Sequence, residues 1–314
     1  MRAFAVETLG QAPAIHDLPT PSADGAFLIR VKSAGVNPID YKLLERLTAA
    51  TTYPYVMGID FAGVVEGVPA GERDFHVGDR IFGQARTHGA YAEYTTVAPG
   101  QKTEPLARIP DGVSDDDAAA LPIPAVTALG SLDLLGIAAG QSLVVMGATG
   151  GVGGYAVQMA SARGAHVIAT VRGDADEARR LGALEVYDSK SADVIEALRA
   201  SRPGRVDAVL DLVNGPDTIG RDADILRPGG ALVSTIGAAN RAWFAERQIA
   251  AHNIVSSASP MSSPEGLAEI ARMLEAGAIS ARIRSRVGLD GAGQVLEKLR
   301  TGGLHGKGVI RLQA

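Results

Sequence analysis

Hydrophobic and polar residues alternate in two different ways along the chain, and the pattern changes near residue 113. Before that point the apolar segments are short, and glycine, proline and aspartate interrupt them. The clearest of these segments are "AFLIRVKSAGV", "GIDFAGVVEGV", "GDRIFGQ" and "GAYAEYTTV". Short apolar or alternating segments between turn residues are typical of β-strands. Residues 1–113 are therefore predicted to form an irregular β barrel or sandwich with few helices.

From residue 114 onward, strand-like segments alternate with helix-like segments. The order is "SLVVM", "GGYAVQMASARG", "HVIATVR", "DEARRLG", "VDAVLDLV", "PDTIGRDADILRPGG" and "ALVSTIG". This alternation predicts a parallel sheet with crossover helices. After about residue 257 the pattern changes again, to a helix, a strand, a second helix and a final strand, "KGVIRL".

The acidic run Asp115 to Asp117 follows Ser114, a good helix N-cap. Negative charge in the first turn stabilises a helix, because it lies at the positive end of the helix dipole. Three adjacent side chains point around a helix and not at one ion, which disfavours a metal site. We therefore interpret this run as a capped, solvated helix start.

The segment "LVVMGATGGVGGYAVQMA" places small residues between an apolar strand and a helix. A helix N-terminus offers unpaired N–H groups and partial positive charge, and phosphate can approach it only where no Cβ intervenes. The segment is a G-x-G-x-x-G pattern with alanine in the first position, and it is not a Walker loop. It predicts a dinucleotide-binding turn formed by Ala148, Thr149, Gly150, Gly151, Val152 and Gly153.

The end of the following strand indicates which dinucleotide binds. A site for NAD usually carries Asp or Glu about 20 residues after the glycines. Here the strand ends Thr170-Val171-Arg172, and a guanidinium at that place favours the 2′-phosphate of NADP. Asp174 and Asp176 follow closely and could accept from ribose hydroxyls instead, so NAD stays open.

Composition narrows the classes of function. The chain has 314 residues, of which 46% are hydrophobic, enough for two domains with cores. A net charge of −5 and the lack of a Lys/Arg-rich block argue against binding nucleic acid. The chain has no cysteine, which excludes disulfides, thiolate zinc sites and a cysteine nucleophile. No apolar run reaches about 18 residues and no signal-peptide core is present, so a soluble, cytoplasmic protein is expected.

In family order and over nearly the whole chain, the segments resemble the medium-chain dehydrogenase/reductase superfamily, in its zinc-independent quinone oxidoreductase (zeta-crystallin-like) branch. The matching pieces are "AGVNPIDYKLL", "PYVMGIDFAGVV", "VGDRIFG", "GAYAEYTTV", "LPIPAVTAL", "GATGGVGGYAVQMA", "RPGGALVSTIG" and "GKGVIRL". The resemblance implies an α/β protein in which a Rossmann doubly wound parallel sheet is inserted in a GroES-like, β-rich catalytic domain. The expected boundaries are 1–113, 114–256 for the NADP-binding domain, and 257–314 as the return segment.

The resemblance also implies reduction of a quinone, an enone or a similar conjugated carbonyl compound by NADPH. Asn37 and Thr127 match family positions at the nicotinamide end of the cleft, Ile236 and Gly237 match the loop near the carboxamide, and Lys307 matches a position beside the cofactor. Zinc-dependent relatives carry Cys at position 37 and Gly-His-Glu at positions 58–60. This chain has Asn37 and Gly58-Ile59-Asp60, so neither a metal nor its Lewis-acid chemistry is expected.

Without a metal, the enolate or hydroquinone charge must be met by a hydroxyl, an amide or water. The candidate catalytic residues are Asn37, Tyr41 and Tyr53. Each tyrosine is as well explained by packing in a wall. Asp40 and Asp60 are interpreted as structural, because aspartate in glycine-rich loops often binds backbone N–H groups.

Two other functions remain open: an NADP-binding sensor or structural protein with little turnover, and a 2-enoyl thioester reductase. The second would need a basic patch for the thioester's phosphate, with Arg241, Arg247 and Lys307 as possible members. A homodimer is expected from the resemblance alone.

Overall fold

The computed structural model describes residues 1–87, 89–100, 103–202 and 205–312. Two compact units are present. The terminal unit comprises Met1–Ile123 and Ser262–Ala314, and the central unit comprises Pro124–Met261. The central unit is thus an insertion between two stretches that fold together.

The terminal unit is built mainly from antiparallel strands. Its larger sheet has the order β15-β16-β3-β5-β6-β8, with β7 also pairing with β3, and its smaller sheet has the order β2-β1-β4. The strands are β1 (Arg2–Val6), β2 (Ala14–Asp17), β3 (Phe27–Val36), β4 (Tyr55–Val56), β5 (Asp60–Gly67), β6 (Arg80–Gln84), β7 (Tyr94–Val97), β8 (Leu106–Arg108), β15 (Ile283–Gly288) and β16 (Lys307–Arg311). The helices are α1 (Pro38–Leu44), α2 (Asp115–Ala119), α8 (Pro264–Glu275), η3 (Leu289–Gly291) and α9 (Ala292–Arg300).

The alternation seen in the sequence builds the core of this unit. Along β3, Phe27, Ile29 and Val31 are buried and the residues between them are not. They pack in one cluster with Phe61 of β5 and Ile81 of β6. Each such side chain contributes about 1.5–3 kcal/mol when it is buried.

The C-terminal segment joins the unit through strand pairing and through one buried carboxylate. β16 pairs with β3 in antiparallel register. Asp116 of α2 accepts hydrogen bonds from Ser33 Oγ (2.6 Å), Arg286 Nε (3.0 Å) and Arg311 Nη2 (2.5 Å). The Ser114 cap is confirmed, since its side chain accepts from the Asp117 amide. The interpretation of the acidic run as solvated is wrong for Asp116, which is 7% exposed because it joins three strands to α2.

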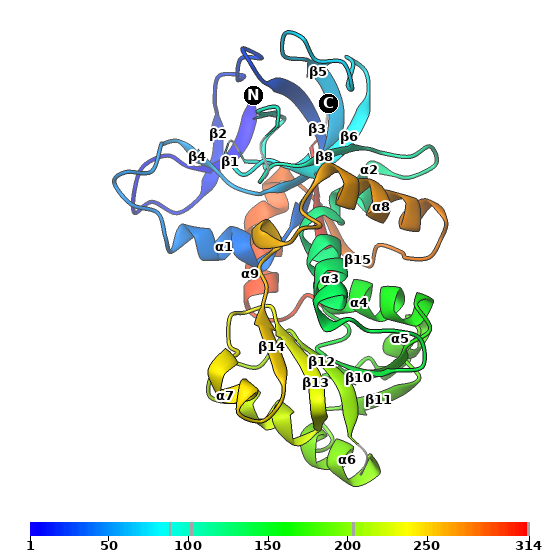
Figure 1. Ribbon diagram of the computed structural model, residues 1–314. Coiled ribbons are helices and arrows are strands. Elements are labelled where there is room, and N and C mark those ends of the chain that lie inside the picture. The colour runs from blue at the N-terminus through cyan, green and yellow to red at the C-terminus, as the bar shows by residue number, and fades with distance from the viewer. Residues whose placement is uncertain (88, 101–102, 203–204, 313–314) are drawn as a thin grey trace. The chain divides into compact units, whose positions relative to one another are not determined.

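The central unit contains the predicted alternation of strands and helices. Its parallel sheet has the order β11-β10-β9-β12-β13-β14, and Figure 1 shows most of these strands side by side. The strands are β9 (Ser142–Met146), β10 (His166–Val171), β11 (Glu185–Asp188), β12 (Val206–Asp211), β13 (Leu226–Ser234) and β14 (Ala250–Asn253). The helices are α3 (Pro122–Leu135, whose first two residues lie in the terminal unit), α4 (Gly151–Ala162), α5 (Ala175–Arg180), α6 (Val194–Ser201), η1 (Ile219–Asp224), α7 (Arg241–Ala245) and η2 (Ser256–Ala258).

The strand interiors of this sheet are almost entirely apolar, as expected for strands covered on both faces. Val144, Ile168, Val209 and Leu232 come from four strands and belong to one buried cluster. The parallel sheet that the resemblance implied is therefore present in the central unit.

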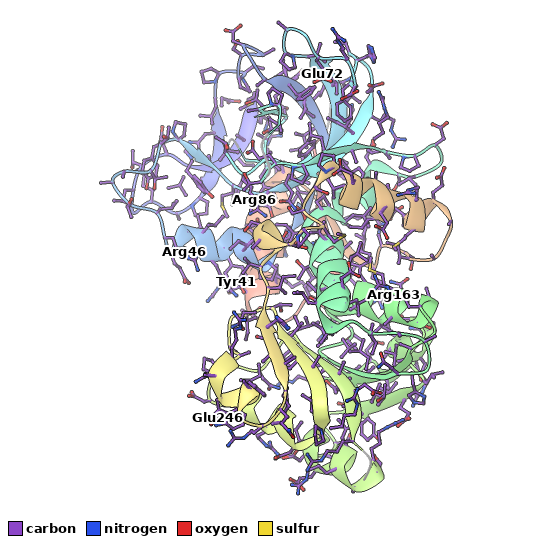
Figure 2. All side chains as sticks on the ribbon, in the orientation of Figure 1. Tyr41, Arg46, Glu72, Arg86, Arg163 and Glu246 are labelled. Carbon is purple, nitrogen blue, oxygen red and sulfur yellow. The ribbon has the colours of Figure 1, made fainter. Side chains whose placement is uncertain are left out.

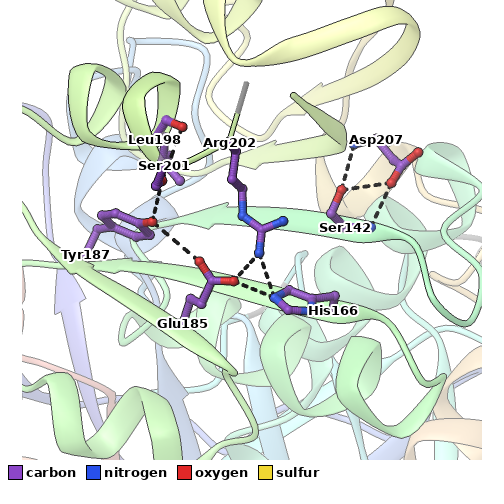
Figure 3. Close-up of polar contacts among 8 residues, drawn as sticks. All are labelled: Ser142, His166, Glu185, Tyr187, Leu198, Ser201, Arg202 and Asp207. Carbon is purple, nitrogen blue, oxygen red and sulfur yellow. Dashed lines mark hydrogen bonds and ion pairs between the residues drawn. The ribbon is translucent and has the colours of Figure 1, made fainter. Parts of the chain in front are cut away.

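The amino ends of the strands in this sheet carry side chains that bind one another (Figure 3). Glu185 Oε1 contacts His166 Nε2 at 2.6 Å and also pairs with Arg202. On the neighbouring strands, Asp207 Oδ2 accepts from both the amide and the hydroxyl of Ser142, each at 2.8 Å. This edge is a closed set of polar contacts.

In the described parts of the chain, no helix combines the length and the apolar character needed to cross a membrane.

Candidate functional site

The carboxyl ends of the central strands form the edge where a ligand is expected. From β9 the chain passes to β10 on one side, and β12 later pairs with β9 on the other side. The strand order therefore reverses between β9 and β12. In open parallel sheets, ligands bind in the crevice beyond the carboxyl ends at such a switch point.

The glycine turn lies at this switch point and begins at Gly147, which has φ +82°. Gly150 is the N-cap of α4. A Cβ at Gly153 would lie 2.3 Å from the Gly147 carbonyl oxygen, and one at Gly150 would lie 3.2 Å from the same atom. The three glycines with structural requirements are thus spaced by three residues, and the turn starts one residue before Ala148, which is fully buried.

The turn fits a pyrophosphate group. The N-terminus of α4 leaves amides of its first turn without partners inside the helix, and its dipole favours negative charge. Gly150 and Gly151 put no side chain over those amides, whereas the buried Thr149 and the partly buried Val152 flank them. These residues can hold a dinucleotide by backbone contacts.

Two cationic side chains lie at the end of β10. Arg172 is exposed, and its side chain makes no hydrogen bond or ion pair with the described residues. A Cβ at Gly173 would lie 3.4 Å from Lys190 Nζ, so this ammonium approaches the same turn. Lys190 follows β11, two residues after Asp188, whose carboxylate accepts from the amides of Gly173 (3.1 Å) and Lys190 (2.9 Å).

Asp174 and Asp176, the two acids that left NAD open, lie at the start of α5. Asp176 Oδ1 pairs with Arg179 at 3.1 Å, and Asp174 is exposed at the start of α5 with φ +65°.

Apolar side chains are exposed at the same edge, after β12 and β13. Val213 is 58% exposed and Ile236 is 45% exposed, although both are large and hydrophobic. Gly237 follows with φ +77° and open space around its Cα. Thr127, on α3, is buried, and its carbonyl accepts from Ser131 Oγ at 2.7 Å.

In the terminal unit, Lys307 lies at the centre of a buried polar network. It is 3% exposed, and its Nζ donates to Asn37 Oδ1 (2.7 Å) and Val36 O (2.8 Å). Asn37 Nδ2 donates in turn to Asp60 Oδ2 at 2.8 Å. Asp60 also accepts from the Ile123 amide at 3.0 Å. Burial lowers the pKa of Lys307, and the nearby carboxylates of Asp60 and Asp40 oppose that change.

Asp40 and Tyr91 extend the network. Asp40 Oδ2 accepts from the Asn37 amide and from the Tyr91 hydroxyl, both at 2.7 Å. Burial raises the pKa of Asp40 from 3.8 to about 7, against the lowering effect of these two hydrogen bonds. Burial likewise raises the pKa of Asp60 to about 6, against the charge of Lys307. One ammonium thus faces two carboxyl groups.

The tyrosines proposed from the sequence are placed differently from Tyr91. Tyr41 lies on α1 and is partly exposed (Figure 2). Its hydroxyl bonds to no other described residue. The Tyr53 hydroxyl donates to the Thr48 carbonyl at 3.2 Å, within the loop after α1. Neither belongs to the network around Lys307.

Sequence reasoning missed Tyr91, Lys190 and Val213 as members of these sites. Tyr91 lies in a segment with an ordinary strand pattern, and no local signal distinguishes it. Lys190 was detectable, because it follows the strand adjacent to Arg172 in a parallel sheet, where carboxyl ends meet at one edge. Asp40 and Asp60 do bind backbone amides, as interpreted, and they also form part of the network.

The basic patch expected of a thioester reductase, with Arg241, Arg247 and Lys307 as possible members, stays a prediction. Lys307 is buried in the terminal unit, whereas Arg247 stacks on the Trp243 ring at 3.6 Å in the central unit.

Among the described residues, no group of three or more His, Asp or Glu side chains is placed to hold a metal ion.

Comparison with known proteins agrees with this architecture. The alcohol dehydrogenase GroES-like domain family matches residues 23–111, and the zinc-binding dehydrogenase family matches residues 151–276. A quinone oxidoreductase of Rattus norvegicus is 30% identical over 309 residues, which cover 94% of this chain and 91% of the relative. A trans-enoyl reductase of Aspergillus japonicus is 31% identical over 223 residues, which cover 65% of this chain and 64% of the relative.

A solved structure of a quinone oxidoreductase from Pseudomonas syringae superposes with a TM-score of 0.87 at 27% identity, over 99% of both chains. The sequence match over nearly the full length and the shared fold point to one family. The chain belongs to the quinone oxidoreductase branch of the medium-chain dehydrogenase/reductase superfamily.

Proposed function

We infer that the protein is an NADPH-dependent reductase of conjugated carbonyl compounds, such as quinones and enones. The observation that carries this inference is the glycine turn at the switch point, with Arg172 and Lys190 at the end of the next strand. The relatives named quinone oxidoreductase and trans-enoyl reductase support the class of substrate.

The charges at the end of β10 support NADPH over NADH. A 2′-phosphate carries about two negative charges, and guanidinium and ammonium groups bind it by charge-assisted hydrogen bonds. The carboxylate of Asp188 already accepts from two backbone amides. Asp176 is held by Arg179. Ribose hydroxyls would therefore have to compete with existing partners for either of these two carboxylates.

When bound, NADPH supplies a hydride to the electrophilic carbon of the substrate. The residues of the chain hold the nicotinamide and the substrate in position for this transfer. We assign the nicotinamide end to Asn37, Thr127, Ile236 and Gly237, following the family resemblance. The network behind Asn37 uses both polar atoms of its amide, so Asn37 acts as a fixed wall and not as a proton donor.

The remaining negative charge on the substrate oxygen needs a donor that the protein does not already use. The Tyr41 hydroxyl meets this condition, together with solvent water, whereas Tyr53 must first leave the Thr48 carbonyl.

We propose that this chemistry requires no zinc. The chain lacks cysteine, and Asn37 and Asp60 stand where zinc-dependent relatives carry Cys and Glu. Both are already bound to each other at 2.8 Å. Metal analysis of purified protein should show well under one zinc per chain, and chelation should leave turnover unchanged. Stoichiometric zinc lost together with activity would contradict the proposal.

A matched substrate panel tests the reaction. NADPH oxidation is measured with 1,4-benzoquinone, 2-cyclohexenone and crotonyl-CoA, and with cyclohexanone as the saturated control. We expect turnover of the quinone or the enone. Cyclohexanone should not react, because it lacks the conjugated double bond whose carbon accepts the hydride in the proposed reaction. Tight NADPH binding without turnover of any member would favour a sensor or structural role. Preference for crotonyl-CoA would favour the enoyl thioester reductase, which the Aspergillus relative also supports.

We also propose a homodimer. β14 is one of the two edge strands of the central sheet among the described strands, with β11 at the other side, and the family resemblance implies a dimer contact at a sheet edge. Sedimentation of the purified protein at twice the mass of one chain is the expected result, and a monomer would refute it.

A further inference from the structure

Two carboxyl groups meet in the interior of the central unit, where a single negative charge is already difficult to bury. Asp222 of η1 is fully buried, and its Oδ2 takes no hydrogen bond from a donor in the described residues. Asp211, the last residue of β12, is also fully buried, and Asn214 Nδ2 contacts both carboxyl groups, Asp211 Oδ2 at 2.7 Å and Asp222 Oδ1 at 3.5 Å. Two buried carboxyl groups that share one donor cannot both be ionised without a large free-energy cost, so one of them holds a proton.

The proton belongs to Asp222, because Asp211 has the partners that stabilise a charge. Asp211 Oδ1 accepts from the amides of Val213 and Asn214, both at 2.8 Å. Its Oδ2 accepts from Asn214 Nδ2 at 2.7 Å. Asp222 has only the long contact of 3.5 Å from the same Nδ2. Burial first, and then the neighbouring Asp211, raise the pKa of Asp222 from 3.8 to about 10.

The turn held by Asp211 contacts the glycine turn across the switch point. A Cβ at Gly147 would lie 2.7 Å from Val213 Cγ1 and 3.8 Å from Leu212 Cβ. Val213 itself is exposed on the ligand side of this edge. The two turns that flank the expected crevice therefore touch, and the position of one depends on Asp211.

We propose that protonated Asp222 is a positioning residue for the dinucleotide: its O–H donates to Asp211, which holds Val213 against Gly147 and so shapes the crevice for the cofactor. This inference rests on the proposed function. It assigns a role to a residue that the proposed chemistry does not otherwise use. Arg221 on η1 is the charged group beside Asp222 that opposes the protonated form, and Asp211 on β12 is the one that favours it.

Three variants separate this role from a general effect of mutation. Asp222→Asn keeps a neutral donor for Asp211. Asp222→Ala removes the donor, so the Asp211 carboxylate loses the hydrogen bond that Asp222 is proposed to donate. Asp224→Ala is the matched control, since it changes the same residue type two positions away on an exposed face of η1.

The first measurement is NADPH affinity by fluorescence titration. We expect Asp222→Ala to weaken NADPH about tenfold, which corresponds to about 1.4 kcal/mol. The NADPH affinities of Asp222→Asn and Asp224→Ala should stay within about threefold of the wild-type affinity. The first variant keeps a neutral donor for Asp211, and the second changes a residue that does not contact Asp211. Unchanged affinity in Asp222→Ala, or equal loss in the Asn and Ala variants, would overturn the proposal.

The second measurement needs no cofactor, so it separates failure of this inference from failure of the proposed function. Hydrogen exchange of the Val213 and Asn214 amides reports directly on the turn that Asp211 holds. Exchange should be at least about tenfold faster in Asp222→Ala than in the wild type, with Asp222→Asn unchanged. Equal exchange in all variants would refute the positioning role, even if the wild type binds NADPH.

Should Asp222→Ala fail to fold, alkaline titration replaces it. Above about pH 10 the wild type loses the shared proton, so its NADPH affinity should fall, whereas Asp222→Asn has no proton to lose there and should hold its affinity. Parallel behaviour of the two proteins would contradict the proposal.

Discussion

The amino and carboxyl ends of the strands in the central sheet form two edges, which differ in how far their side chains are already paired with one another. At the amino edge, Glu185, His166 and Arg202 bind one another, and Asp207 binds Ser142 and Arg227 (2.8 Å). At the carboxyl edge, Arg172 has no partner among the described residues and Val213 is 58% exposed.

This difference indicates which end of the strands binds a ligand. A polar group that the protein already satisfies gains little from a ligand, whereas an exposed cation, an open helix N-terminus and an exposed apolar side chain gain from one. The amino edge therefore contributes stability, and the carboxyl edge contributes binding. Variants at the two edges should separate the two properties.

The largest effect is expected from Gly150→Val at the carboxyl edge. The valine side chain would fill the place of the pyrophosphate beside the N-terminus of α4, where even a Cβ lies 3.2 Å from the Gly147 carbonyl. NADPH affinity should fall by at least about a hundredfold, or about 3 kcal/mol. Fluorescence titration measures the affinity, and circular dichroism checks the fold.

Gly288→Val is the matched control for this variant. Gly288 has an ordinary φ of −76° and no atom within 4 Å of an added Cβ. It should bind NADPH as the wild type does. A folded Gly150→Val protein with unchanged affinity would mean that the glycine turn serves packing alone.

The next effect concerns the choice between NADPH and NADH. Arg172→Ala should weaken NADPH about ten- to a hundredfold and leave NADH unchanged, because NADH has no 2′-phosphate. Lys190→Ala should act in the same direction. Arg199→Ala, an exposed arginine paired with Glu196 on α6, is the control and should alter neither. Equal losses for both cofactors in Arg172→Ala would show a surface arginine with no role in this choice.

The two edges should also respond oppositely to pH. Asp222 has a raised pKa, so its folded state binds more protons than the unfolded chain between about pH 4 and pH 10, and stability falls as pH rises through that window. Hydrogen bonds from Ser142 and Arg227 lower the pKa of Asp207 although burial opposes them, so its contribution is present above about pH 4 and is lost as pH falls.

Thermal melts over a pH series check this contrast. The melting temperature of Asp222→Asn relative to the wild type should rise steadily from about pH 4 toward pH 9. Asp207→Asn should be less stable than the wild type at neutral pH, and the difference should shrink below about pH 4. A difference independent of pH for Asp222→Asn would mean that Asp222 is not protonated in the folded protein.

The smallest effect is expected from Glu185→Gln at the amino edge. It weakens the pairs with Arg202 and His166, which are partly exposed, so we expect a loss of about 1 kcal/mol of unfolding free energy. NADPH affinity should not change, as shown by the same titration. A loss of affinity without a loss of stability would break the distinction between the edges.

The fold could be predicted from the sequence because periodicity and turn residues act locally. Alternation along β3 and the apolar runs of the central strands were both visible, and the Ser114 cap was recognised. The ion cluster around Asp116 was not predictable, because Arg286 and Arg311 lie far away in the sequence and meet it only through strand pairing.

The same division applies to the candidate sites. The glycine turn is a local pattern and was found, although its first glycine is Gly147 and not the position of Ala148. The network of Lys307, Asn37 and Asp60 joins three distant segments, and only the family resemblance indicated any of its members. No sequence pattern indicates the pair of Asp211 and Asp222, because its proposed role depends on burial and on a shared proton.

The central claim is that the carboxyl edge of the central sheet binds NADPH in preference to NADH. Calorimetric titration of the wild-type protein with each cofactor tests it most directly. The account predicts one site per chain and an affinity for NADPH at least about tenfold higher than for NADH, because Arg172 and Lys190 meet the 2′-phosphate. Equal affinities, or tighter binding of NADH, would contradict it.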